Sequence, residues 1–242
     1  MNLYDTYDEN GVYLSTEDDT DVHYKGLWHK VMRIWLYDVD GNIYLREDKS
    51  THKLDVINEV HILSTEGITE CFDRGMYEKL GIHFPASSNL QMIKSKKFSK
   101  SQIFTNKNEM RDNFFLCDYI GEFDKNVNFL MLSDDTEKLI KANAKGILNL
   151  ISSRNGEVVG YDVSVINDVE RSKKFITIKD IFEDDDENTY NKYRDIVFEI
   201  DKISQKFKRE ESEREKMTAY VNRNNDDKFK SHANENDGTD IY

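Results

Sequence analysis

Residues 60–82, VHILSTEGITECFDRGMYEKLGI, combine carboxylates with an arginine at a spacing that could bind a cation. Glu70 and Arg74 are four residues apart, as are Arg74 and Glu78, so on a helix the three side chains would share one face. Carboxylate oxygens are the ligands that Mg²⁺ prefers in proteins. The alternating charges are explained most simply as a ladder of structural ion pairs.

The same stretch resembles the Nudix box, whose pattern is G-x5-E-x7-R-E-U-x-E-E-x-G-U, with U a bulky aliphatic residue. The positions that agree are Glu66, Arg74, Met76, Glu78, Gly81 and Ile82. Val60 replaces the first glycine, Gly75 the glutamate after the arginine, and Lys79 the second glutamate of the pair. The residues that build the loop and helix are retained, whereas two of the three helix carboxylates are lost.

The resemblance implies a Nudix-like fold and Mg²⁺- or Mn²⁺-dependent cleavage of a diphosphate linkage. In the family, the three helix carboxylates hold the metal against the diphosphate, and the metal activates a water. The matching face here reads Gly75, Glu78 and Lys79, so one carboxylate remains beside a positive charge. Glu78 and Glu66 are the predicted catalytic and metal-binding residues, and Arg74 is a predicted ligand-binding residue. Hydrolysis is expected to be weak or lost.

Histidines flank the box in a pattern that resembles the isopentenyl-diphosphate-isomerase-like branch of the Nudix family. In that branch one histidine precedes the first core strand and another follows the opening glycine of the box. His29 and His61 hold those places, with His23 nearby. In the true isomerases such histidines join carboxylates around a metal, and imidazole suits zinc or manganese. His29 and His61 are therefore predicted ligand-binding residues, although Glu59 replaces the isomerase cysteine and no downstream Glu-x-Glu matches.

The apolar pattern predicts an α/β (α+β) fold, a mixed sheet sandwiched between helices. Strands are expected over residues 28–37, 43–45, 113–120 and 158–166. Asp40-Gly41 between the first two is a strong hairpin signal. The basic run 94–102 is interpreted as a solvated surface loop.

Helices are expected over 66–80, capped by Thr65 and Gly81, and from Asp134 to about Ser152. A third helix carries an apolar seam at three- and four-residue steps: Tyr193, Ile196, Ile200, Ile203 and Phe207. Docking on its own domain is the default, and a protein partner at residues 196–207 is the alternative. The expected parts are an acidic N-terminal arm or edge strand (1–18), a Nudix-like domain (19–182), this helix (183–221) and a disordered polar tail (222–242).

The composition disfavours several classes of function. The 242 residues carry a formal net charge of −13, which argues against electrostatic binding to nucleic acids or anionic membranes. No apolar run approaches the ~20 residues of a membrane span, and the N-terminus lacks the pattern of a signal peptide. Cys71 and Cys117 lie on apolar runs and are expected to be buried and structural. A cytoplasmic protein is expected.

Three functions are compatible with these patterns. The first is a Nudix-fold protein that binds a nucleoside-diphosphate-like ligand, with weak or lost hydrolysis. The second is a working metal-dependent hydrolase whose ligands are Glu66, Glu70, Glu78 and a histidine. The third is a protein-interaction module acting through the C-terminal helix. If the carboxylates converge on one point, the active hydrolase is favoured. If Lys79 lies between them, the binding protein with weak or lost hydrolysis is favoured.

Overall fold

The computed structural model describes residues 2–84, 89–103, 109–123, 133–164, 173–181 and 187–234. Its main sheet has the strand order β11-β10-β9-β4-β3-β8-β7, with β5 paired to β4 and β6 to β3. The strands are β3 (His29–Tyr37), β4 (Asn42–Asp48), β5 (Leu54–Asp55), β6 (Asn58–His61), β7 (Leu90–Ile103), β8 (Glu109–Glu122), β9 (Thr136–Asn143), β10 (Val158–Asp162) and β11 (Lys173–Ile176).

Strand β3 is the centre of the sheet and makes it mixed. It runs parallel to β8, from His29 opposite Phe114 to Tyr37 opposite Glu122, and antiparallel to β4 and β6. The β3–β4 hairpin turns at Gly41, whose φ of +85° suits glycine, so the hairpin predicted at Asp40-Gly41 is confirmed.

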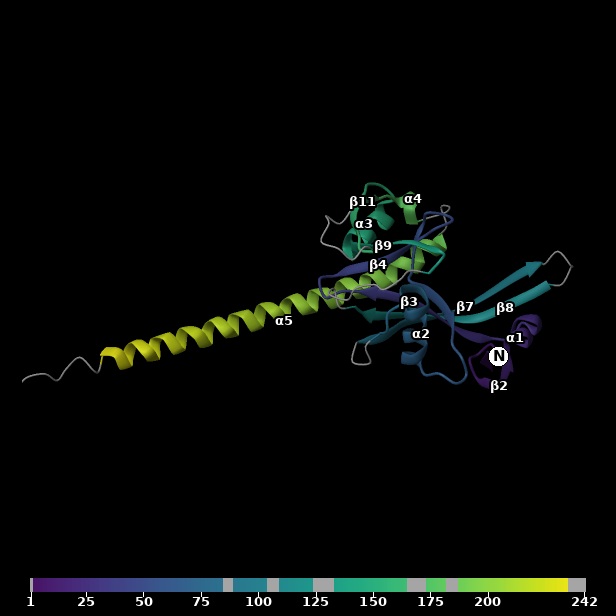
Figure 1. Cartoon of the computed structure of the whole chain (residues 1–242), viewed down its shortest axis with the longest axis horizontal. Coiled ribbons are helices and arrows are strands. Elements are labelled where there is room, and N and C mark those ends of the chain that lie inside the picture. The colour runs from purple at the N-terminus through teal and green to yellow at the C-terminus, as the bar shows by residue number, and fades with distance from the viewer. Residues whose placement is uncertain are drawn as a thin grey trace, which may run out of the picture.

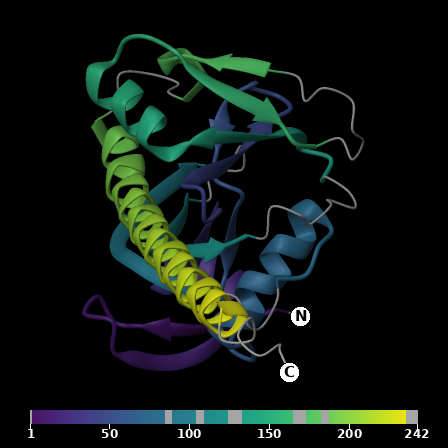
Figure 2. The same ribbon diagram turned by 90° about the vertical axis from the view of Figure 1, so that its left-hand side faces the viewer.

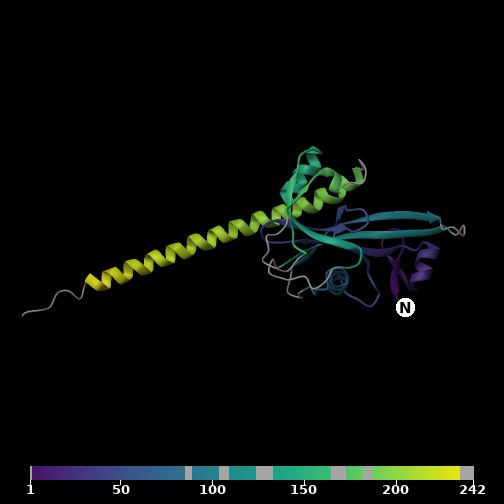
Figure 3. The same ribbon diagram turned by 45° about the horizontal axis from the view of Figure 1, so that its top comes forward.

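Alternate side chains of β3 enter two hydrophobic cores, one on each face of the sheet. Met32, Ile34 and Leu36 pack with α2 (Ile68–Leu80). Trp35 and Tyr37 pack against α3 (Ala144–Ser153), α4 (Ile178–Ile181) and α5 (Glu187–Asn234). Figure 3 shows α3 and the start of α5 on one side of the sheet and α2 on the other. The predicted sheet between helices is confirmed.

The first residues form a separate unit at one end of the molecule (Figure 2). Strands β1 (Leu3–Tyr7) and β2 (Tyr13–Asp18) pair as their own two-stranded sheet rather than as an edge of the main one. Helix α1 (Asp19–Lys25) follows and ends at Gly26 in the left-handed conformation. The Ser64 N–H donates to the Leu3 carbonyl oxygen (2.9 Å), which ties β1 to the loop before α2.

The helix predicted from Asp134 to Ser152 is wrong in its first half. Thr136–Asn143 is strand β9, which pairs with β4, and the helix begins only at Ala144, where the Asn143 side chain accepts from the Gly146 N–H. Strand β9 lies between two helical layers, so Leu139 and Ile140 are both buried and the strand lacks alternation. The acidic cluster before it therefore mimics a helix start.

Two further expectations on secondary structure are corrected. Residues 94–102 belong to strand β7, paired along its length with β8, and are not a loop. Of the strand expected over 158–166, residues 158–162 form β10, and residues 165 and 166 lie outside the described part of the chain.

Helix α5 docks on the domain through the first half of its seam. Tyr193, Ile196 and Ile200 are buried against α3 and the sheet, so the default expectation is confirmed. The helix then runs on to Asn234, through residues 222–234 that were expected to be disordered (Figure 1). That segment contains neither proline nor glycine, so nothing in it stops a helix already started on the domain. Residues 235–242 of the expected tail lie outside the described residues. None of the helices described is both long and apolar enough to span a membrane.

Candidate functional site

The loop before α2 is organised by Glu66 and Arg74. Arg74 donates through Nε and Nη2 to the two Glu66 oxygens at 3.0 and 2.6 Å, and Glu66 Oε1 also accepts from the Leu63 N–H at 2.8 Å. Burial alone would raise the pKa of Glu66, but the hydrogen bonds from Arg74 and Leu63 hold that pKa below its ordinary value. Glu66 thus stays ionised as an anchor for the loop.

Arg74 also holds Glu78 and the end of β6. Its Nη1 donates to Glu78 Oε1 at 3.0 Å, and its Nη2 donates to the His61 carbonyl oxygen at 2.7 Å. Glu70 does not extend the expected ladder; it accepts from the Gly67 N–H at 2.6 Å, and Gly67, not Thr65, caps α2. The two predicted metal ligands, Glu66 and Glu78, therefore share one arginine. Because the positive charge of Arg74 already neutralises part of the negative charge of Glu66 and Glu78, these carboxylates attract a metal ion less strongly.

Two departures from the box pattern, Gly75 and Val60, lie next to each other in the core. A Cβ atom built on Gly75 would lie 2.4 Å from Ile34 Cδ1 and 3.2 and 3.3 Å from the two methyls of Val60. Position 75 thus faces the core against β3 and β6, and the side chain of Val60 fills the space beside it. Gly75 and Val60 are a matched small and large pair, and no side chain at position 75 could be added without displacing others.

Lys79 turns away from the remaining carboxylates. Its Nζ donates to Asp135 Oδ2 at 2.5 Å, at the turn that leads into β9, and Arg46 lies 3.4 Å from the same oxygen. Although burial raises the pKa of Asp135, the Lys79 hydrogen bond helps to hold it at about 2. Lys79 therefore does not occupy a site between Glu66 and Glu78.

Three histidines converge at the N-terminal end of β3. His23 comes from α1, His29 from the first residue of β3, and His61 from the last residue of β6. One ring nitrogen of each lies within 4.8 Å of the other two. The Nδ1 atoms of His23 and His29 lie 2.8 and 3.1 Å from the carbonyl oxygens of Asp19 and Leu27. A carbonyl can only accept, so both Nδ1 atoms carry a proton.

Asp112 of β8 completes this cluster. Its Oδ1 lies 3.5 Å from His29 Nε2 and 3.7 Å from His23 Nε2. Three buried atoms here have no hydrogen-bond partner among the described residues: His29 Nε2, His61 Nδ1 and Asp112 Oδ1. Each unpartnered buried polar atom costs about 1–3 kcal/mol, so this arrangement of unpartnered atoms favours the binding of a cation. The set of three imidazoles and a carboxylate is one that Zn²⁺ or Mn²⁺ accepts.

Two histidines of the cluster, His29 and His61, are enclosed in a way that favours their neutral form. Tyr4, itself buried, packs with its ring centre 5.3 Å from that of His61 and 6.0 Å from that of His29. Burial lowers the pKa of His29, and burial together with the neighbouring His29 and His23 lowers that of His61 to about 4. Neutral imidazole is the form that binds metals, so at neutral pH the nitrogens are ready to do so.

The sequence pattern found His29 and His61 and noted His23, but it missed Asp112. Asp112 lies two residues before Phe114, the residue opposite His29 in the parallel β3–β8 pair. This register is a long-range feature that no local motif announces. The hydrogen bond from Arg74 to the His61 carbonyl oxygen joins the cluster to the box.

Cys71 and Cys117 are both free and buried, as expected. Burial raises the pKa of each thiol, most strongly at Cys71, so neither is a reactive thiolate at neutral pH.

No protein-family model matches the chain, and no curated protein does. Solved structures with a similar fold include DR0079 from Deinococcus radiodurans, with a TM-score of 0.42 and 16% identity over 62% of this chain and 88% of that one. A MutT/nudix family protein from Enterococcus faecalis has a TM-score of 0.38 and 11% identity over 71% and 61% of the two chains. The E. coli dihydroneopterin triphosphate pyrophosphohydrolase has a TM-score of 0.37 and 11% identity over 50% and 84%.

Proposed function

We propose that this chain is a Nudix-type protein that binds a divalent transition-metal ion through its histidine cluster and Asp112. The observation that carries the proposal is the convergence of His23, His29 and His61. Asp112 lies beside His29 and His23, and buried atoms of His29, His61 and Asp112 have no hydrogen-bond partner among the described residues. A Zn²⁺ or Mn²⁺ ion held by these residues would supply a Lewis acid for a phosphate oxygen.

The ligand we propose is a nucleoside-diphosphate-like molecule, with phosphoanhydride hydrolysis at the box weak or lost. The ligand class rests on the resemblance of residues 60–82 to the Nudix box. Loss of hydrolysis is supported by the contacts of the box: Arg74 compensates Glu66 and Glu78, and Gly75 faces the core. In the part of the chain that the structure describes, the histidines form the one group of three or more side chains suited to a metal.

An active hydrolase with unusual ligands is the alternative. It needs Glu66, Glu70 and Glu78 to meet at one point with a histidine. Glu70 instead closes the N-terminus of α2, which gives this alternative less support.

Metal titration of the full chain tests the proposal. Isothermal titration calorimetry with Zn²⁺ and Mn²⁺, and the visible absorption of bound Co²⁺, are expected to show one site per chain. The double variant His29→Ala/His61→Ala should lose it. The matched control His52→Ala/His83→Ala removes two histidines whose side chains are 69% and 72% exposed and should retain it.

The box variant Glu78→Gln separates the two candidate metal sites. It should bind Zn²⁺ like the wild type, because Glu78 is not part of the histidine cluster. Loss of binding in Glu78→Gln, or full binding in His29→Ala/His61→Ala, would place the metal at the box and overturn the proposal. Turnover of nucleoside diphosphate derivatives with Mg²⁺ or Mn²⁺, abolished by Glu78→Gln, would establish the hydrolase alternative.

A further inference from the structure

The distal half of α5 extends away from the body of the molecule (Figures 1 and 3). Residues 213–221 are all exposed, whereas Val197 and Ile200 are buried on the domain. Three of the exposed side chains are large and apolar: Met217, Tyr220 and Val221. Most of the stability of a helix in a protein comes from tertiary packing, and exposed apolar side chains on a stretch that projects from the domain are a sign of a missing partner.

The charges on this helix are arranged in two blocks. From Lys202 to Arg209 the charged residues are all basic: Lys202, Lys206, Lys208 and Arg209. From Glu210 to Glu215 they are acidic except for Arg214: Glu210, Glu211, Glu213 and Glu215. Two parallel copies would place like charges together. Two antiparallel copies, centred on the boundary between Arg209 and Glu210, place each basic block against an acidic one.

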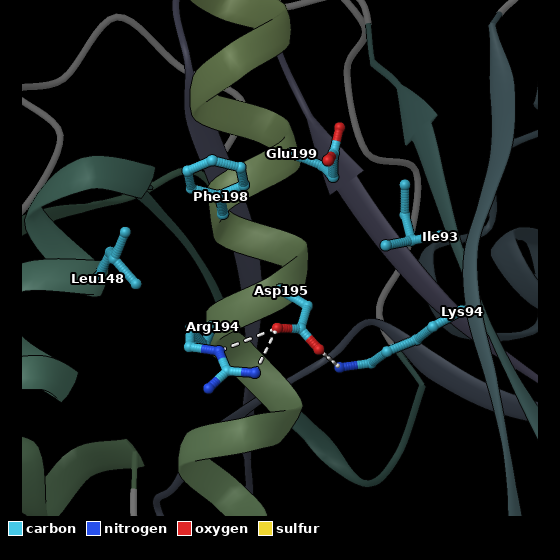
Figure 4. Close-up of a pocket in the computed structure, with 7 residues that line it drawn as sticks. All are labelled: Ile93, Lys94, Leu148, Arg194, Asp195, Phe198 and Glu199. Carbon is cyan, nitrogen blue, oxygen red and sulfur yellow. Dashed lines mark hydrogen bonds and ion pairs between the residues drawn. The ribbon is translucent and has the colours of Figure 1, made fainter.

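The same register brings apolar surfaces together. With that centre, Val221 of one copy comes level with Phe198 of the other, and Tyr220 with Glu199. Phe198 is 58% exposed and lines a cavity of about 440 Å³ with Ile93 of β7 and Leu148 of α3 (Figure 4). The charged side chains lining it are Lys94, Arg194, Asp195 and Glu199. Val221 of one copy thus comes level with the apolar part of the groove in the other copy, which is formed by Ile93, Leu148 and Phe198.

We propose that the chain forms a homodimer through antiparallel pairing of its α5 helices, with Tyr220 and Val221 of each copy seated at the groove beside Phe198 of the other. Phe198 and Val221 are 23 residues apart, so the helices overlap over about 35 Å at 1.5 Å per residue. Each copy supplies one groove and one Tyr220–Val221 segment, so each groove is filled once and the assembly closes as a two-fold dimer.

Sedimentation equilibrium of the full chain, with charge-reversal variants, tests the pairing. The wild type is expected to dimerise. Reversal of the basic block (Lys206→Glu/Lys208→Glu/Arg209→Glu) or of the acidic block (Glu210→Lys/Glu211→Lys/Glu213→Lys) should weaken dimerisation at least tenfold. The variant that combines all six substitutions should dimerise again, because the basic and acidic blocks have then exchanged places. A control that reverses exposed lysines elsewhere, Lys49→Glu/Lys145→Glu/Lys173→Glu, should remain dimeric.

Cross-linking tests the orientation and does not depend on the charge variants. Lys202 of one copy is expected level with Met217 of the other. A mixture of Lys202→Cys and Met217→Cys chains should therefore form an oxidised mixed dimer, and neither alone should cross-link efficiently. A monomeric wild type, a variant with all six substitutions that stays monomeric while its circular dichroism is native, or efficient cross-linking of Met217→Cys with itself would each overturn the proposal.

Discussion

Gly75→Ala adds one methyl group where α2 is pressed against β3 and β6. The new Cβ would lie 2.4 Å from Ile34 Cδ1 and 3.2 Å from the nearer methyl of Val60, both in the buried core on this face of the sheet. Alanine favours a helix over glycine by up to about 1 kcal/mol. Overpacking a filled core costs about 1–3 kcal/mol. The steric cost is the larger, so we expect a net loss of about 1 kcal/mol in the free energy of unfolding.

A double-mutant cycle with Ile34→Val isolates the steric part. Ile34→Val removes the methyl group that obstructs position 75 and by itself costs about 0.5–1.5 kcal/mol. In that background Gly75→Ala should be neutral or stabilising, which gives a coupling free energy of about 1–2 kcal/mol. Urea denaturation followed by circular dichroism measures all four free energies, with an unchanged m-value as the check for two-state unfolding.

Either of two results would refute this reasoning. One is a Gly75→Ala protein more stable than the wild type, and the other is strict additivity with Ile34→Val. If the reasoning holds, Gly75→Glu with Lys79→Glu should destabilise the protein rather than restore a metal ligand, because Val60 still fills the space at position 75.

Three further predictions concern the site. The pKa of His61 is about 4 in the folded protein against an ordinary 6.5, so the unfolded chain binds more protons between these two pH values. The free energy of unfolding should therefore fall by up to about 3 kcal/mol as the pH drops from about 6.5 to 4. In the variant His61→Gln, the free energy of unfolding measured in urea should change less over the same pH range. Arg74→Gln removes the ion-pair partner of Glu66 and should lower the free energy of unfolding in urea by about 2–4 kcal/mol. Glu78→Gln removes a more exposed ion pair and should lower it by less than about 1 kcal/mol. Equal losses of stability in the two variants would contradict the anchoring role of Glu66. Asp112→Asn should weaken Zn²⁺ binding about 10- to 100-fold by calorimetry, and an unchanged affinity would exclude Asp112 from the metal site.

Local signals in the chain were enough to predict several elements. The Asp40-Gly41 turn, the core strand before it, and a helix ending at Gly81 each depend on residues close in sequence. The strand at Thr136–Asn143 could not be predicted in this way, because its type is set by pairing with β4 and by burial on both faces. The acidic residues that precede this strand are equally typical of the start of a helix, and only the pairing with β4 decides between a helix and a strand.

The sequence by itself determined which side chains can do chemistry. They are the box residues Glu66, Arg74 and Glu78, and the histidines His29 and His61 that flank the box. Only the tertiary structure decided how they are used. It directs Arg74 onto both carboxylates, and the parallel register of β3 and β8 brings Asp112 to the histidines. The physical reason is that a motif specifies residues along the chain, whereas a metal site requires atoms from separate strands and helices to meet in space.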